Sequence, residues 1–257
     1  MFFRKVIYGK ISFEQEDTIM RFKGQRIVVI GGSSGIGFAT AKMAAAEGAA
    51  VVIASRSEER LQKAKSGIQG DVEILTVNVV DEGSVKAFFD KAGEFDHLTT
   101  PGNEAAMGRF LEMDTKTARA AFDSKFWGQY HAAKYGAPRL RSGGSITLFA
   151  GIWSQRPVAG GTVITAINRA IEGLGRALAM ELAPIRVNTV SPGIVDTPIY
   201  SMMTPEAKVS MFKEASASLP AKRIGKPEEI AKTVLYLMSN GYATGSTLYV
   251  DGGATLR

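Results

Sequence analysis

The chain of 257 residues contains no cysteine, only two histidines and no long hydrophobic run. The absence of cysteine excludes disulfides and thiol nucleophiles and is typical of a reducing compartment, so we expect a cytoplasmic protein. No apolar stretch approaches the roughly 18 residues that cross a membrane as a helix. The two histidines, His97 and His131, are expected to be structural, and no His, Asp and Glu cluster has metal-ligand spacing. We therefore expect neither a metal nor a membrane as a partner.

The charge balance is also uninformative about a macromolecular partner. The net charge is +6, from 31 Lys and Arg against 25 Asp and Glu. A basic chain can bind polyanions, but here the basic residues are scattered rather than gathered in one stripe. We expect a solvated basic surface and no nucleic-acid partner. No linker, low-complexity segment or internal repeat divides the chain, which predicts a single domain.

The first 19 residues, MFFRKVIYGKISFEQEDTI, stand apart from the rest. Charges interrupt their apolar residues, so they do not form a secretion signal. One interpretation is an upstream start or a loose, disordered arm. The other is an extra edge strand or a subunit contact, made through the apolar residues Phe2, Phe3, Ile7 and Phe13. In either case we expect the folded domain to cover residues 20–257.

A glycine-rich turn is the strongest motif. The β-branched run Ile27–Ile30 predicts a buried strand, and Gly31, Gly35 and Gly37 follow it directly. A helix-forming run comes next and ends at Gly48. Glycines let the backbone approach a phosphate closely, and a helix N-terminus offers free N–H groups and partial positive charge. The turn at 31–37 therefore predicts a phosphate cradle.

Strand-like and helical segments alternate through the remainder. Strands are expected near 51–54, 72–77, 97–100, 145–149, 186–190 and 248–250, and helices near 57–66, 82–92, 115–139, 162–183 and 227–239. This alternation predicts a parallel sheet covered on both faces. The fold class is thus α/β, a single Rossmann-type doubly wound sheet of about seven strands.

Four motifs in order resemble the short-chain dehydrogenase/reductase family: GGSSGIG at 31–37, VNTVSPGIVDTP at 187–198, KRIGKPEEIA at 222–231 and TGSTLYVDGG at 244–253. The resemblance covers about residues 22–253. It implies a nicotinamide cofactor and a homotetramer or homodimer. In the long helix at 162–183, the small residues Gly173, Gly175 and Ala179 would pack either against a second subunit or against the sheet.

The resemblance also implies where the cofactor binds. At the end of the second strand, Ser55 and Arg56 stand where an acidic residue would select NAD(H). Because arginine grips a phosphate with two N–H groups, NADP(H) is favoured over NAD(H). The cofactor-binding residues would be Gly31, Ser33, Ser34, Gly35, Ile36, Gly37, Ser55, Arg56, Asn78, Val79, Pro101, Gly102, Asn168, Pro192, Gly193, Ile194 and Thr197.

The reactive positions depart from the family pattern. The Ser of the family falls on Gly151, its Tyr on Ile164, its Lys on Asn168 and its helix Asn on Lys125. After the fourth strand, Thr100-Pro101-Gly102-Asn103 replaces the usual Asn-Asn-Ala-Gly. A register slip of one would offer Thr165 and Arg169, but it rotates them about 100° around the helix, away from the site.

Two functions remain open. One is an NADP(H)-dependent oxidoreductase with atypical or weak activity on an apolar carbonyl, enone or quinone. The other is a non-catalytic nucleotide-binding protein, such as a partner subunit or an NADP(H) sensor.

Lys125 is the candidate catalytic residue. It would polarise a carbonyl if it points into the pocket, and would be structural if it reaches solvent. The hydroxyls of Ser154, Thr162 and Thr165 are weaker candidates. The segment 194–222 is expected to form a lid, whose apolar residues either wall the pocket or pack the lid itself: Ile199, Met202, Met203, Met211 and Phe212.

Overall fold

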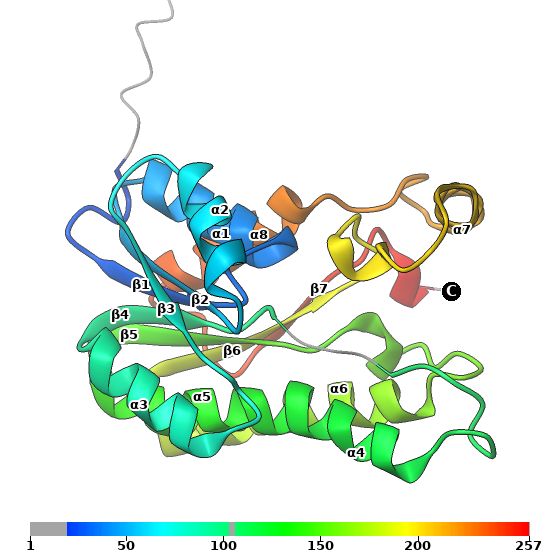
Figure 1. The fold of residues 1–257 in the computed structure, drawn as a ribbon, viewed down its shortest axis with the longest axis horizontal. Coiled ribbons are helices and arrows are strands. Elements are labelled where there is room, and N and C mark those ends of the chain that lie inside the picture. Colours follow the sequence, from blue (N-terminus) through cyan, green and yellow to red (C-terminus); the bar gives the residue numbers. More distant parts are fainter. Residues whose placement is uncertain (1–19, 103–105, 257) are drawn as a thin grey trace, which may run out of the picture.

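The computed structural model describes residues 20–102 and 106–256, which form one parallel seven-stranded sheet in the order β3-β2-β1-β4-β5-β6-β7 (Figure 1). The predicted fold class is therefore confirmed. The strands are β1 (Arg26–Ile30), β2 (Ala50–Ser55), β3 (Val72–Thr76), β4 (Phe95–Thr99), β5 (Leu140–Phe149), β6 (Arg186–Pro192) and β7 (Thr247–Val250). Residues 1–19, for which two interpretations were open, lie outside the described residues.

Helices cover both faces of the sheet (Figure 1). They are α1 (Gly35–Ala46), α2 (Glu58–Ser66), α3 (Glu82–Ala92), α4 (Thr115–Phe122), α5 (Gly128–Gly136), α6 (Thr162–Glu181), α7 (Pro205–Ser218) and α8 (Pro227–Ser239). Side chains alternate across β1, so Ile27 and Val29 pack on the side of α1, α2 and α8, while Val28 and Ile30 pack on the side of α3, α5 and α6. Two hydrophobic cores therefore lie on opposite faces of one sheet.

The helical stretch expected at 115–139 is present and changes its hydrogen-bond pattern along its length. Between α4 and α5 lies a π-helical turn, η1 (Asp123–Trp127), in which the Gly128 N–H donates to the Asp123 carbonyl five residues earlier. A π-turn inserts an extra residue into the helix and changes which side chains face the sheet. The chain after α5 forms a short 3₁₀ turn, η2 (Ala137–Arg139), before β5. The predicted helical stretch is therefore confirmed over its whole length, and the π-helical turn within it is an additional feature.

The small residues of α6 divide between two faces. A Cβ on Gly175 would lie 2.4 Å from Thr189 Oγ1, so this glycine packs against β6. A Cβ on Gly173 would meet nothing within 4 Å. Ala179 is buried in the core. The sheet-packing interpretation therefore holds for Gly175 and Ala179, and Gly173 faces away.

The order of the sheet reverses between β1 and β4, since the chain builds outwards in one direction from β1 and in the other from β4. At such a switch point the connections leave on opposite faces and open a crevice at the carboxyl ends of the strands. Gly31 follows β1 and Gly102 follows β4, and the Gly102 N–H donates to the Ile30 carbonyl at 3.3 Å. The two loops therefore meet at this edge of the sheet.

Candidate functional site

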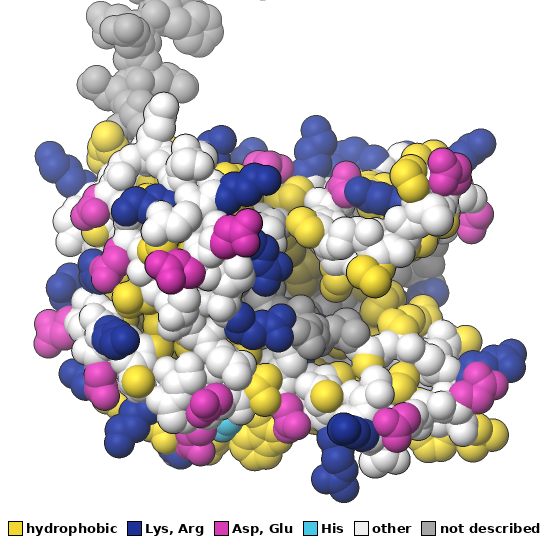
Figure 2. Space-filling model, in the orientation of Figure 1, with side chains coloured by type: hydrophobic (Ala, Val, Ile, Leu, Met, Phe, Trp, Pro, Cys, Tyr) yellow, Lys and Arg dark blue, Asp and Glu magenta, His cyan; other side chains and the backbone are white. Residues whose placement is uncertain are grey.

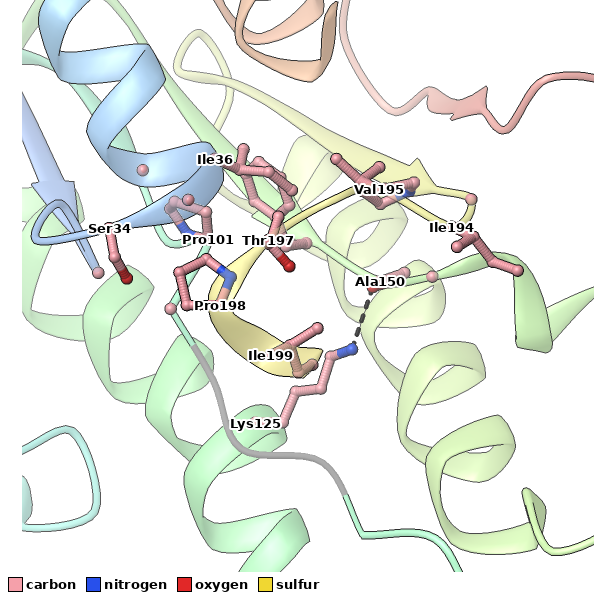
Figure 3. A pocket seen from close by; sticks show the side chains of 18 of the residues that line it. Ser34, Ile36, Pro101, Lys125, Ala150, Ile194, Val195, Thr197, Pro198 and Ile199 are labelled. Carbon is pink, nitrogen blue, oxygen red and sulfur yellow. Dashed lines mark hydrogen bonds between the residues drawn. The ribbon is translucent and has the colours of Figure 1, made fainter. Parts of the chain in front are cut away.

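A pocket of about 360 Å³, here called the main pocket, lies at the carboxyl edge of the sheet (Figure 3). A smaller cavity of about 180 Å³, the adjoining pocket, shares Gly31, Ser34, Arg60 and Gly102 with it. In the space-filling view the surface is hollowed between the two helical layers (Figure 2). Lys and Arg are spread over this face among acidic side chains (Figure 2).

The glycine turn forms one wall of the main pocket. Gly31 has φ +92°, and a Cβ there would lie 2.4 Å from the Gly102 backbone. A Cβ on Gly37 would lie 2.2 Å from the Gly31 carbonyl oxygen. These positions admit only glycine, and they bring the N-terminus of α1 to the pocket with its N–H groups exposed to an anion. A phosphate-bearing cofactor fits this cradle.

Every residue that the sequence assigned to the cofactor lines one of the two cavities. The main pocket is lined by Gly31, Ser34, Gly35, Ile36, Gly37, Pro101, Gly102, Asn168, Pro192, Gly193, Ile194 and Thr197. The adjoining pocket adds Ser33, Ser55, Arg56, Asn78 and Val79. Asn103 lies outside the described residues.

Sequence reasoning missed Arg60, which lines both cavities from the first turns of α2. Its signal was present, because it lies four residues after Arg56 in the run SRSEER. It also missed the apolar residues Ile152 and Trp153 of the 3₁₀ turn η3 (Ile152–Ser154). No pattern identifies a short turn that closes over a pocket.

Lys125 lies in the π-helical turn and lines the main pocket. Its exposed fraction is 5%, and its Nζ donates to the Ala150 carbonyl at 3.1 Å (Figure 3). Burial disfavours the charged form and lowers the pKa of Lys125 from 10.5 to about 7. Lys125 therefore points inward rather than to solvent, and its amine gains or loses a proton near neutral pH.

The other three departing positions gather around the same cavity, because Gly151, Ile164 and Asn168 all line the main pocket. Asn168 occupies space beside Gly151, where a Cβ would lie 3.0 Å from its Nδ2. The Asn168 Oδ1 atom is buried and has no hydrogen-bond partner within the described part of the chain. A buried carbonyl oxygen without a partner is costly, so it suits a ligand that donates a hydrogen bond.

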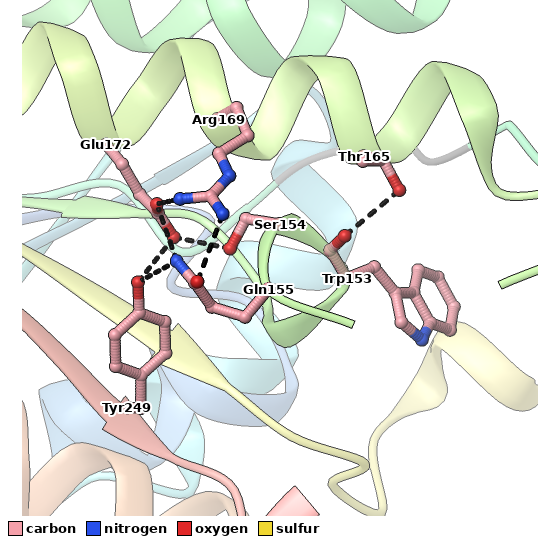
Figure 4. Close-up of polar contacts among 7 residues, drawn as sticks. All are labelled: Trp153, Ser154, Gln155, Thr165, Arg169, Glu172 and Tyr249. Carbon is pink, nitrogen blue, oxygen red and sulfur yellow. Dashed lines mark hydrogen bonds and ion pairs between the residues drawn. The ribbon is translucent and has the colours of Figure 1, made fainter. Parts of the chain in front are cut away.

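The hydroxyls considered as substitutes do not line the main pocket. Thr162 is the first residue of α6, and Thr165 Oγ1 donates to the Trp153 carbonyl at 3.0 Å (Figure 4). The buried Ser154 hydroxyl donates to Glu172 instead. Arg169, offered by the register slip, bonds Glu172 and Gln155 outside the pocket. Ser154, Thr165 and Arg169 thus have hydrogen-bond partners outside the lining of the main pocket.

A polar cluster holds the turn after β5 in place (Figure 4). Glu172 on α6 accepts from Ser154, from Gln155 at 3.3 Å and from the Tyr249 hydroxyl at 3.2 Å. Arg169 forms an ion pair with the same carboxylate at 3.3 Å. The cluster thus ties η3 to α6 and β7, and it fixes the backbone that carries Gly151.

The remaining predictions are mixed. His97 is buried in β4 and bonds Ser145 and Gln25, and burial lowers its pKa to about 4, as suits a structural residue. Of the five apolar lid residues, Ile199 lines the main pocket. Met202 is 94% exposed, and Phe212 packs on Tyr200 with ring centroids 5.3 Å apart. Of the two interpretations, the pocket wall therefore holds for Ile199 and packing within the lid segment for Phe212.

His131 on α5 lies near the Val79 carbonyl, at 3.4 Å, and lines neither cavity. Within residues 20–102 and 106–256, no three His, Asp or Glu side chains are grouped so that they could hold a metal ion. No helix in this described portion combines the length and apolarity needed to cross a membrane.

Comparison with known proteins identifies the family. Residues 30–255 match a protein-family model described as enoyl-(acyl carrier protein) reductase. The chain is 34% identical to the short-chain dehydrogenase/reductase ATR9 of Stachybotrys chlorohalonatus, over 91% of this chain and 98% of the relative. It is 29% identical to the 3-oxoacyl-[acyl-carrier-protein] reductase FabG of Thermotoga maritima, over 92% of this chain and 100% of the relative.

Solved structures agree. A small-chain dehydrogenase in complex with NADPH is 37% identical, with a TM-score of 0.79 over 91% of this chain and 99% of the other. The MalC reductase/Diels-Alderase of Malbranchea aurantiaca is 26% identical, with a TM-score of 0.86 over 93% and 100%. With its parallel sheet, glycine turn and matched length, the chain belongs to the short-chain dehydrogenase/reductase family of oxidoreductases.

Proposed function

We propose that the protein is an NADP(H)-dependent reductase of an apolar carbonyl, enone or quinone, with Lys125 as its proton donor. The observation that carries the proposal is the position of Lys125, whose buried Nζ reaches the main pocket. Relative to the family pattern, lysine and asparagine have exchanged places between Lys125 and Asn168. A cation therefore remains at the site, but η1 supplies it instead of α6.

The roles of the residues follow from this exchange. The nicotinamide ring supplies a hydride when the cofactor is bound. Ile164 has no proton to give, so the developing charge on the substrate oxygen needs another donor. A lysine whose pKa is about 7 is matched to general acid work near neutrality. The unpartnered Asn168 Oδ1 accepts a hydrogen bond, for which a ribose hydroxyl of the cofactor is suited.

The pocket supports an apolar substrate. Its walls include the apolar side chains of Ile152, Trp153, Ile164, Ile194 and Ile199. Arg60 also lines the main pocket, at the side where the adjoining pocket begins, and it lines both. Apolar walls with a few placed polar groups are typical of small-molecule sites. Substrates that need little proton assistance, such as enones and quinones, would react more readily than simple ketones.

The test measures NADPH consumption over a panel of quinones, enones, ketones and aldehydes. The control variant is Lys134→Met, which changes an exposed lysine of α5. We expect consumption with quinones or enones and little with simple ketones. The alternative function, a nucleotide-binding protein without redox turnover, predicts NADPH binding and no consumption with any class. Ketone reduction at rates on the order of 1–10³ per second would show that another group replaces the missing tyrosine.

Arg56 and Arg60 should select NADP(H). Both line the adjoining pocket beside Ser33 and Ser55, where a ribose 2′-phosphate would meet two cations. Replacing either with alanine should weaken NADP⁺ binding by about 1.5–3 kcal/mol and leave NAD⁺ binding nearly unchanged. Calorimetric titration of both cofactors measures this, and Arg139→Ala, which breaks an exposed pair with Asp90, is the matched control. Equal losses for NADP⁺ and NAD⁺ would contradict phosphate recognition.

A further inference from the structure

The environment of Lys125 suits a second kind of chemistry, because a buried lysine in an apolar cavity is also a nucleophile. Only a neutral amine has the lone pair that attacks a carbonyl carbon, and burial raises the share of lysine that is neutral near pH 7. The Nζ atom has one hydrogen-bond partner among residues 20–102 and 106–256, the Ala150 carbonyl at 3.1 Å. That carbonyl accepts an N–H and leaves the nitrogen lone pair unused.

Among residues 20–102 and 106–256, no acidic side chain lines the main pocket. The other titratable or charged side chains that line it are Arg60 and Tyr200. α6 and the end of β5 contribute Ile164, Asn168 and backbone, none of which carries a charge. No ion pair within the described residues includes Lys125, and burial alone lowers its pKa.

The cavity also offers room and a polar partner for an adduct. Gly151 adds no side chain, and the main pocket measures about 360 Å³. The Asn168 Oδ1 atom is buried, and no donor in the described part of the chain bonds it, so it can accept a hydrogen bond from the hydroxyl of an addition product. A small apolar aldehyde or ketone would bury its hydrocarbon part against the isoleucines of the wall.

We propose that Lys125 captures apolar aldehydes and ketones as a reversible imine in the main pocket. The amine nitrogen bonds to the carbonyl carbon, and the oxygen takes a proton to become the hydroxyl of a carbinolamine. The proton on that oxygen comes from the amine. The hydroxyl then leaves as water with the second amine proton and a carbon–nitrogen double bond remains, so no electrons are gained or lost overall. The inference shares its pocket and substrate class with the proposed function but does not depend on redox turnover.

The experiment is reductive trapping on the full chain without cofactor. The protein is mixed near neutral pH with benzaldehyde and sodium cyanoborohydride, which reduces an imine to a stable benzylamine. Peptide mapping by mass spectrometry then gives the rate of benzylation at each lysine. We expect Lys125 to react about tenfold to a hundredfold faster than exposed lysines such as Lys134, because more of its amine is neutral near pH 7. Lys125→Arg should remove this fast label, and Lys134→Arg should leave it.

The wild-type peptide map decides the outcome without any variant, so a misfolded variant does not affect it. Label spread over exposed lysines, with Lys125 no faster than they are, would overturn the inference. Fast labelling without NADPH consumption supports the capture site and counts against the proposed reductase. NADPH consumption without fast labelling leaves Lys125 as a proton donor and overturns the capture site alone.

Discussion

Replacing Lys125 with methionine should lower NADPH-dependent turnover by about 10²–10⁴-fold, because it removes the proton donor from the main pocket. That loss corresponds to roughly 3–5 kcal/mol of barrier. Methionine keeps the unbranched apolar stem and so preserves packing in a site where the lysine is 5% exposed. NADP(H) affinity should change little, since the glycine turn, Arg56 and Arg60 lie elsewhere in the two cavities.

The pH profile separates this role from a structural one. The donor must carry its proton, so the rate should fall as pH rises above the pKa of Lys125, which is about 7 without ligand. Bound cofactor phosphates are negative and shift this decline to higher pH. The decline should be absent from the residual rate of Lys125→Met and present in the control Lys134→Met. Full activity in Lys125→Met would remove Lys125 from the reaction.

Gly37→Ala should abolish detectable NADP(H) binding and destabilise the fold. The added Cβ would lie 2.2 Å from the Gly31 carbonyl oxygen, so the turn between β1 and α1 must open. Overpacking of this kind costs about 1–3 kcal/mol, and more where backbone opposes the new atom. Cofactor titration and urea denaturation measure the two effects.

The matched control is Gly173→Ala in α6, where a Cβ meets nothing within 4 Å. That change should keep NADP(H) affinity and stabilise the helix by up to about 1 kcal/mol. Native cofactor affinity in Gly37→Ala would show that the glycine turn is not the phosphate cradle.

Most of the fold could be predicted from sequence because its signals are local. The buried β-branched run of β1, the glycine turn and the helix ending near Gly48 each follow from backbone physics within a few residues. Gly48 indeed has φ +90°. Strand starts were less accurate, since β4 begins at Phe95 and β5 at Leu140, before the apolar runs that mark them.

The candidate site was only partly predictable. The pocket-lining residues on the glycine turn, on α6 and at the end of β6 could be predicted, because residue spacing along a regular helix or strand determines which side chains lie on the same face. The π-helical turn that carries Lys125 has no sequence signature, because it depends on how Asp123–Trp127 packs between α4 and α5. The sequence alone therefore does not determine whether the Lys125 side chain points to solvent or into the pocket. The Glu172 cluster was missed because its partners come from α6, β7 and the turn after β5.

The contact between Gly151 and Asn168 makes the side chains that the two positions accept depend on each other. A serine at 151 would place its Cβ 3.0 Å from Asn168 Nδ2, so the Asn168 side chain would have to shift by a few tenths of an ångström to admit it. A smaller side chain at 168 would relieve this contact. The two positions therefore couple: the effect of Gly151→Ser should depend on which side chain stands at 168, and the two substitutions should not be additive.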